Sequence, residues 1–160
     1  SGGDALKELA KAKGYSVSDK GWWETDEGLN FMKLRQKDPK FDLEVDKYLI
    51  SKLESEEKII IDSWTLPYLI EDKKAVKIFL KADLKVRAER VAKRDGITVE
   101  EAEKRIVEKD SRTKRIYRQL YGFKLGEDLL IFDLVLDTSK LTVEETFKVV
   151  STFIEFVHKK

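Results

Sequence analysis

A carboxylate directly after an apolar run is the first feature of this sequence that could do chemistry. Asp62 follows three consecutive isoleucines, 59–61, in the segment KIIIDSWTLPYL. An apolar run bounded by polar residues predicts a strand buried on both faces, as in a parallel sheet. Ligands bind beyond the carboxyl ends of such strands, where an aspartate can hold Mg²⁺ near transferring phosphates, often through water. Asp62 is therefore either a site residue or a cap for the turn at Thr65.

Two predicted helices each carry three basic residues at helical spacing. These are Arg87, Arg90 and Arg94 on the first, and Lys109, Arg112 and Arg115 on the second. Guanidinium groups from two helices can bind a polyphosphate together, because charge spreads over several oxygens as a phosphoryl group transfers. The interleaved Glu89, Glu108 and Asp110 favour instead a solvated face laced with salt bridges. Spacing alone leaves both interpretations open.

The first ten residues, SGGDALKELA, place small residues before a predicted helix in which Asp4 occupies the N-cap. Free backbone N–H groups at a helix N-terminus suit an anion, and Lys7, one turn later, could add a positive charge. A Gly-Gly pair before a helix is equally an ordinary turn, so this segment alone does not decide between the two.

Three tryptophans form the last candidate group. Trp22 and Trp23 are adjacent and cannot face the same way on a helix, while Trp64 follows the predicted strand. Tryptophan is most often a packing residue, but one of these rings at a pocket could stack on a base.

The composition excludes several classes of chemistry. With no cysteine and one histidine, His158, disulfides, thiolate metal sites and cysteine nucleophiles are excluded, and a Ser-His-Asp triad is disfavoured. The formal net charge of +1 argues against a general electrostatic grip on nucleic acid or anionic membrane. No stretch approaches the ~20 apolar residues of a membrane span and no signal peptide opens the sequence, so we expect a cytoplasmic protein. The Lys/Glu-rich, amide-poor composition is typical of thermophile proteins, although lineage bias could produce it as well.

The elements that must position these residues alternate between strand and helix. Strands are predicted at 59–61, 75–82 and 132–139, and helices over 4–13, parts of 21–39 broken at Gly21 and Gly28, 41–53, 83–96, 98–122 and the C-terminal segment after Thr142. Thr98 with Glu101 has the spacing of a capping box. Alternation of this kind predicts an α/β fold with a parallel sheet, in a single domain over 1–160. Three strands are fewer than the ~5–6 of an average sheet.

Four segments, in order, resemble the P-loop nucleoside monophosphate kinases, and especially the archaeal cytidylate kinase-like and adenylate kinase-related proteins. They are SGGDALKELA, DPKFDLEVDK, LKVRAERVAKRDG and KRIYRQLYGFKLGEDLLIFDLVLDTS. The resemblance implies a P-loop NTPase-like parallel sheet sandwiched by helices, with acceptor-binding helices at about 4–55. It also implies a short helical lid at about 94–115, whose many charges and Gly96 hinge predict a mobile segment that closes on ligand.

The resemblance also implies the activity: ATP-dependent phosphoryl transfer to a nucleoside monophosphate or related small acceptor, with Mg²⁺ as cofactor and no nucleic-acid or membrane partner, in a monomer or homodimer. Catalytic roles fall on Asp62, Arg94, Arg112 and Arg115, with Asp62 holding Mg²⁺ through water. ATP-binding roles fall on Arg90, Lys109, Asp137 and Thr138. Acceptor-binding roles fall on Ser1, Asp4, Lys7 and Trp64.

The sequence departs from this family at its start. The family begins with a strand, a GxxxxGK[ST] phosphate loop and a helix, and these 160 residues contain no such motif. A strand, loop, helix and second strand would add roughly 25–30 residues at ordinary element lengths, with the missing first strand lying between 59–61 and 76–80. We therefore expect the natural protein to contain a stretch that this sequence omits, and the 160 residues alone to bind ATP far more weakly.

Two further departures concern the acceptor. Lys7 stands where the family usually has an arginine that binds the monophosphate, and the two are not equivalent at a bidentate site. Asp62-Ser63-Trp64 stands where typical cytidylate kinases have Glu-Gly-Arg. These replacements predict a rebuilt acceptor pocket in an active kinase or, alternatively, a non-catalytic nucleotide-binding or scaffold protein on the same fold.

Overall fold

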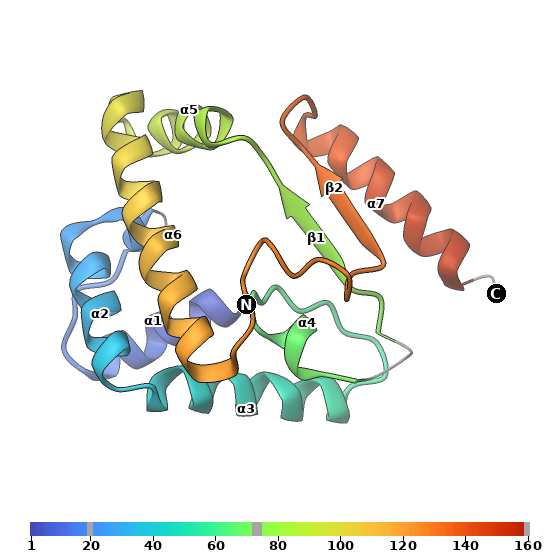
Figure 1. The fold of residues 1–160 in the computed structure, drawn as a ribbon, viewed down its shortest axis with the longest axis horizontal. Helices are drawn as coiled ribbons and strands as arrows, with labels where there is room; N and C mark the ends of the chain where they lie inside the picture. Colours follow the sequence, from blue (N-terminus) through green and yellow to red (C-terminus); the bar gives the residue numbers. More distant parts are fainter. Residues whose placement is uncertain (19–20, 72–74, 159–160) are drawn as a thin grey trace.

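The computed structural model describes residues 1–18, 21–71 and 75–158. Over these residues the chain is mostly helical, with two short strands (Figure 1). In order, the elements are α1 (Gly2–Ala12), the 3₁₀ helix η1 (Trp22–Glu24), α2 (Asp26–Lys37), α3 (Lys40–Ser55), α4 (Leu66–Leu69), β1 (Ile78–Lys81), α5 (Leu84–Asp95), α6 (Val99–Tyr121), β2 (Leu134–Asp137) and α7 (Val143–His158).

The N-terminal helices α1, α2 and α3 pack with η1 around the largest buried apolar cluster. Its central side chains, Trp22 and Phe31, are almost completely buried, and the Trp22 indole nitrogen donates a hydrogen bond to the carbonyl of Ser16 at 2.8 Å. Leu6 on α1 and Val45 on α3 complete the cluster from opposite sides. These helices lie together on one side of the molecule (Figure 1).

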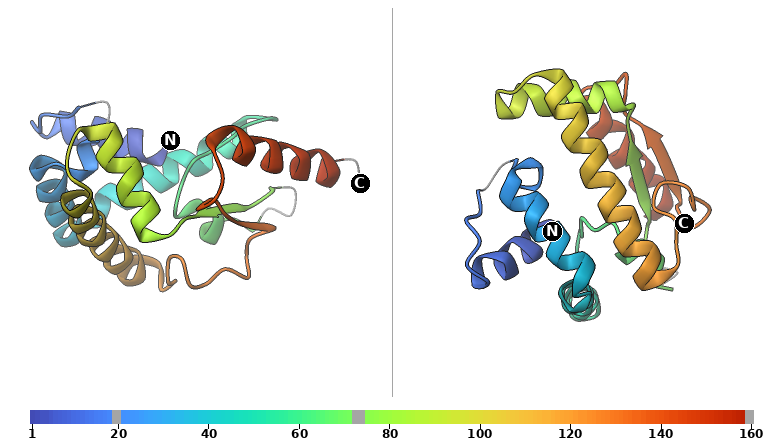
Figure 2. Two further views of the ribbon diagram at one scale, coloured as in Figure 1. Left: turned by 90° about the horizontal axis from the view of Figure 1, so that it is seen from above. Right: turned by 60° about the vertical axis from the view of Figure 1, so that its left-hand side comes forward.

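Helices α5 and α6 form a hairpin that extends from this group. Gly96 ends α5 with a φ of 70°, a left-handed conformation that glycine adopts without strain. Thr98 begins α6 by accepting a hydrogen bond from the Glu101 amide at 3.2 Å, which confirms the predicted N-cap. Alanines at the crossing, Ala88 and Ala102 among them, let the two helices approach closely. At its far end α6 reaches the region of α3 and α4 (Figure 2).

Strands β1 and β2 lie side by side and run parallel, with Ile78 opposite Leu134 and Lys81 opposite Asp137. Their connection is the α5–α6 hairpin, so the prediction of parallel strands joined through helices is confirmed. Helix α7 follows β2 after a capping box in which Thr142 and Glu145 exchange hydrogen bonds.

The predicted strand at 59–61 is wrong, so the described residues contain two strands rather than three. This segment has no regular secondary structure, and no strand in the described parts of the chain lies beside it to pair with its backbone. The side chain of Ile60 is consequently 97% exposed. The prediction of a buried strand at 75–82 is also wrong in its burial, since Leu80 on β1 is 51% exposed. A sheet of two strands with few elements covering it cannot bury both faces.

Gly28 does not break a helix, as the sequence predicts, but lies inside α2. A Cβ atom at this position would lie 2.1 Å from the carbonyl oxygen of Trp22. Glycine is therefore required because η1 and α2 approach each other too closely for any side chain.

No helix within the described residues is long and apolar enough to cross a membrane.

Candidate functional site

A pocket of about 210 Å³ lies between the N-terminus of α1, helices α2, α3 and α6, and the turn at 62–65. Three of its walls come from segments distant in sequence: Gly2 and Gly3, the turn, and Lys109 to Tyr117 of α6. The adjacent tryptophans separate as predicted, with Trp22 in the core and Trp23 lining this pocket.

The pocket has an ion pair in its buried wall. Arg35 of α2 donates two hydrogen bonds to the carboxylate of Asp42 on α3, and both side chains are 3% exposed. Burial alone would lower the pKa of Arg35, but the Asp42 carboxylate outweighs it and the pKa is raised. Tyr117 of α6 lies beside this pair, and burial raises its pKa to about 12. The wall is therefore polar and fixed, with the Arg35 guanidinium charged and the Tyr117 hydroxyl neutral at neutral pH.

A second carboxylate, Asp46, lies one helical turn after Asp42. It accepts a hydrogen bond from the Thr65 hydroxyl at 2.5 Å and another from the Tyr121 hydroxyl. Burial raises the pKa of Asp46, while the two hydroxyl donors oppose that shift. Because Thr65 is also bonded to Ser63 at 3.0 Å, Asp46 anchors the turn at 62–65 to the helices.

That turn forms the rim of the pocket. The Ser63 hydroxyl accepts hydrogen bonds from the amides of Thr65 and Leu66 at 3.3 and 3.2 Å, which folds the chain back after Asp62. This directs Trp64 outward, 42% exposed, with its ring 5.9 Å from the Lys109 ammonium group. Asp62 itself is exposed at the rim, and its carbonyl accepts a hydrogen bond from the Gly2 amide at 2.9 Å.

Lys109 and Arg94, predicted on different helices, meet at one carboxylate. Glu24 of η1 accepts from Lys109 Nζ at 2.5 Å and from Arg94 Nη2 at 3.1 Å. Arg94 also binds Asp95 at 2.6 Å, and this hydrogen bonding raises the pKa of Arg94 and lowers that of Asp95.

The remaining basic residues are partly a salt-bridged face, as the interleaved acids suggested. Arg87 pairs with Asp110 at 2.8 Å, and Arg112 pairs with Glu108 at 2.7 Å. Arg115 is exposed on α6. Of the predicted basic cluster, only Lys109 lines the pocket.

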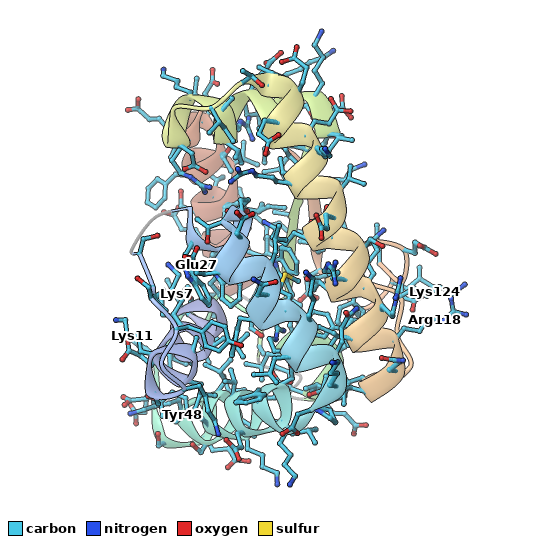
Figure 3. All side chains as sticks on the ribbon, turned by 90° about the vertical axis from the view of Figure 1, so that its left-hand side faces the viewer. Lys7, Lys11, Glu27, Tyr48, Arg118 and Lys124 are labelled. Atoms are coloured by element: carbon cyan, nitrogen blue, oxygen red, sulfur yellow. The ribbon has the colours of Figure 1, made fainter. Side chains whose placement is uncertain are left out.

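Ser1 and Asp4 are joined in a capping box at the start of α1. The Ser1 hydroxyl accepts from the Asp4 amide at 3.2 Å and donates to the Asp4 carboxylate at 2.8 Å, and this hydrogen bond lowers the pKa of Asp4. Ser1, and not Asp4 as predicted, is therefore the N-cap. Lys7 lies further along α1 (Figure 3).

The structure also brings together Arg90 and Thr138, two residues predicted to bind ATP. Arg90 donates to the Thr138 hydroxyl at 3.2 Å and to its carbonyl at 2.7 Å, which fastens α5 to the turn after β2. Asp137 ends β2 directly before this turn and accepts hydrogen bonds from the amide and hydroxyl of Ser139.

Sequence reasoning did not single out Glu24, Arg35, Thr113 and Tyr117, nor assign roles to Asp42 and Asp46. Arg35 and Glu24 are buried charges, but burial is not visible in a sequence. The signal that could have found the aspartates was present, since DPKFDLEVDK places two carboxylates one helical turn apart.

The described residues contain no group of three or more His, Cys, Asp or Glu side chains that could hold a metal ion by themselves. A lone exposed carboxylate such as Asp62 nevertheless fits Mg²⁺, which keeps several waters and is commonly bound through one or two carboxylates and substrate phosphates.

Comparison with known proteins places this architecture in a family. The cytidylate kinase-like family matches residues 3–140. The cytidylate kinase of Pyrococcus abyssi is 34% identical over 97% of this chain and 78% of its own length. The cytidylate kinases of Methanopyrus kandleri and Pyrococcus horikoshii are 34% and 35% identical over 96% and 94% of this chain, and over 77% and 71% of their own lengths. The two parallel strands joined through helices are consistent with the P-loop kinase fold that this likeness implies, and the chain belongs to the cytidylate kinase-like family.

Proposed function

We propose that this protein transfers a phosphoryl group from ATP to a nucleoside monophosphate or related small acceptor, which binds in the pocket between α1, α3 and α6. The observation that carries the proposal is the pairing of a fixed polar wall, Arg35 with Asp42, with an ammonium group and an aromatic face at the rim. A nucleotide needs both kinds of contact, because it combines a polar, flat base with a charged phosphate.

The acceptor's base stacks on Trp64 in this proposal, and its phosphate lies near Lys109 and the N-terminus of α1. Trp64 is exposed enough to offer a ring face. Lys7 does not line the pocket, so its positive charge acts on the phosphate only from further along α1. Ser1 and Asp4 act by fixing the start of α1, because they are bonded to each other.

ATP is held in part at the C-terminal end of β2, where Asp137 and Thr138 follow one another and Arg90 of α5 binds Thr138. Asp62 holds Mg²⁺ through water at the pocket rim, and the bound ion supplies charge neutralisation for the transferring phosphate. Arg112 and Arg115 approach from the segment at about 94–115, which acts as a lid. Arg112 must exchange its pairing with Glu108 to do so.

The chemistry needs no covalent intermediate, because positioning and charge stabilisation suffice for phosphoryl transfer. The chain's own contribution is to hold the acceptor against a rigid wall. The Arg35–Asp42 pair and the Asp46 hydrogen bonds fix that wall before any ligand arrives.

A non-catalytic nucleotide-binding or scaffold role is the second candidate. It is favoured by Lys7 and Trp64 at the positions of two family arginines and by the pairing of Lys109 and Arg94 with Glu24. Such a protein would bind nucleoside monophosphates without transferring phosphate to them, so parallel binding and transfer assays separate the two candidates.

The test is a panel of nucleoside monophosphates and nucleosides, measured for binding and for phosphorylation with ATP and Mg²⁺. Losing one charge-assisted contact weakens the free energy of binding by about 1.5–3 kcal/mol, or roughly ten- to hundredfold in affinity. Stacking of the base on tryptophan strengthens binding by on the order of 1–3 kcal/mol. We expect CMP to be a poor acceptor and Trp64→Arg to change the preference among acceptors.

The control is Tyr48→Arg, which replaces an exposed aromatic residue of α3 that lies outside the pocket (Figure 3). This variant should leave the preference unchanged. The hypothesis of a rebuilt acceptor pocket is wrong if wild type phosphorylates CMP as fast as any other acceptor, or if Trp64→Arg leaves the preference among acceptors unchanged, as Tyr48→Arg should.

A further inference from the structure

Glu24 is a buried acid in contact with cations of both lid helices. Its side chain is 5% exposed, and its two carboxylate oxygens bind different cations, Lys109 at 2.5 Å and Arg94 at 3.1 Å. Its carbonyl oxygen accepts a third bond, from Arg105 Nη1 at 2.7 Å. One short segment therefore binds three basic side chains of α5 and α6.

The arrangement has the form of an occupied anion site. Two oxygens of one carboxylate lie where two cations converge, as two oxygens of a phosphate would. Lys109 also lines the pocket, with its ammonium group 5.9 Å from the Trp64 ring, so this group of charges adjoins the proposed acceptor site through Lys109. A phosphate entering the pocket first meets Lys109, whose charge Glu24 already neutralises.

We propose that Glu24 is an internal counter-ion that fills a phosphate-binding site in the ligand-free protein, and that the phosphate of a ligand displaces it from Lys109 and Arg94. This inference rests on the proposed function, since it takes these two cations as phosphate-binding. The phosphate of the ligand and the Glu24 carboxylate then compete for the same two cations, and this competition lowers the apparent affinity for phosphate.

The local structure allows the exchange. Glu24 ends the three-residue η1 helix, between Gly21 in a left-handed conformation and the extended Thr25. Its carboxylate can therefore rotate away without breaking a long helix. The bond from Arg105 goes to the main chain, so η1 stays attached to α6 when the side chain moves.

The decisive variant is Glu24→Gln, which keeps the shape of the side chain and removes its charge. Inorganic diphosphate is the probe, because it presents the phosphate charge without requiring a base or any transfer reaction. Isothermal titration should show about tenfold or greater gain in diphosphate affinity, the scale of one charge-assisted contact. The double variant Glu24→Gln/Lys109→Met should lose this gain.

Glu27→Gln is the matched control, because it makes the same change in net charge at an exposed residue of α2 (Figure 3). Its diphosphate affinity should equal that of wild type. The inference is overturned if Glu24→Gln binds diphosphate no better than Glu27→Gln, and binding weaker than wild type would show that Glu24 instead holds Lys109 in position.

A loss of stability in Glu24→Gln does not obscure the result. Diphosphate should raise the melting temperature of this variant more than that of wild type, because it replaces the missing charge. Should the variant be unfolded in dilute buffer, diphosphate in excess should refold it, and failure to do so also overturns the inference. The proposed phosphoryl transfer could fail independently, since none of these measurements involves turnover.

Discussion

Asp42→Asn should destabilise the protein strongly, because it leaves the guanidinium group of Arg35 buried without its anionic partner. Both side chains are 3% exposed and joined by two hydrogen bonds, so water cannot replace the lost charge. Removing one partner of such a buried pair costs about 3–5 kcal/mol. Since a domain of this size is stable by only about 5–15 kcal/mol, the loss is a large part of the total.

Urea unfolding followed by circular dichroism measures the change. In a thermal scan the same loss should lower the melting temperature by roughly 6–20 °C, at about 2–4 °C per kcal/mol. Glu8→Gln is the control, because it breaks an ion pair with Lys11, 2.8 Å long, on the exposed face of α1. An exposed pair contributes about 1 kcal/mol at most.

A second variant separates the charge from the packing. Arg35→Met/Asp42→Leu removes both ions and leaves no lone charge, so it should cost less than Asp42→Asn despite changing more atoms. The reasoning is refuted if Asp42→Asn costs no more than Glu8→Gln, or if the apolar double variant is the less stable of the two.

The remaining predictions concern a titration, a glycine and the lid. Burial raises the pKa of the Asp46 carboxyl above its unfolded value. The stability that this group contributes to the fold is therefore complete below the unfolded pKa and is lost as pH rises through the folded pKa. The stability of wild type relative to Asp46→Asn, measured by urea unfolding at several pH values, should fall over that window, and a rise would contradict this expectation. Gly28→Ala should lower the free energy of unfolding in urea by about 1–3 kcal/mol, because its Cβ would lie 2.1 Å from the Trp22 carbonyl oxygen. Gly3→Ala, whose Cβ would have its nearest neighbour at 3.6 Å, should be tolerated, and equal losses in the two variants would be inconsistent with the packing of η1 on α2. Hydrogen exchange should be faster over 94–105, within the lid, than over 116–120, beyond it. The first segment packs on small alanines, whereas the second contains Ile116 and Tyr117 of a larger apolar cluster. Uniform protection along α6 would argue against a mobile lid.

The helices could be predicted from the sequence because their signals are local. Thr98 and Thr142 lie three residues before glutamates, and Gly96 follows a periodic segment, so each boundary depends on residues within one turn. The strand at 59–61 could not be decided in this way. A strand forms only where another lies beside it, and three isoleucines specify apolar character without specifying a neighbour. Gly28 was misinterpreted for a related reason, because its role depends on the approach of Trp22.

The site was predictable residue by residue but not in its connections. Trp64 and Lys109 could each be proposed from the sequence, yet only the fold places the ammonium group over the ring. The capping box of Ser1 and Asp4 was a local pattern that we assigned to the wrong residue. Glu24 carries no sequence signal, since one acid among 31 becomes distinctive only when two helices enclose it.

The pocket lined by Trp23 and Trp64 should bind a nucleoside monophosphate. The three tryptophan indole N–H signals in a ¹H–¹⁵N correlation spectrum test it directly, because Trp22 is 1% exposed and bonded to Ser16, whereas the other two line the pocket. Titration with a panel of nucleoside monophosphates should shift the Trp64 and Trp23 signals saturably for at least one member and leave Trp22 in place. If no nucleotide moves the Trp64 signal at saturating concentration, the pocket is not the acceptor site.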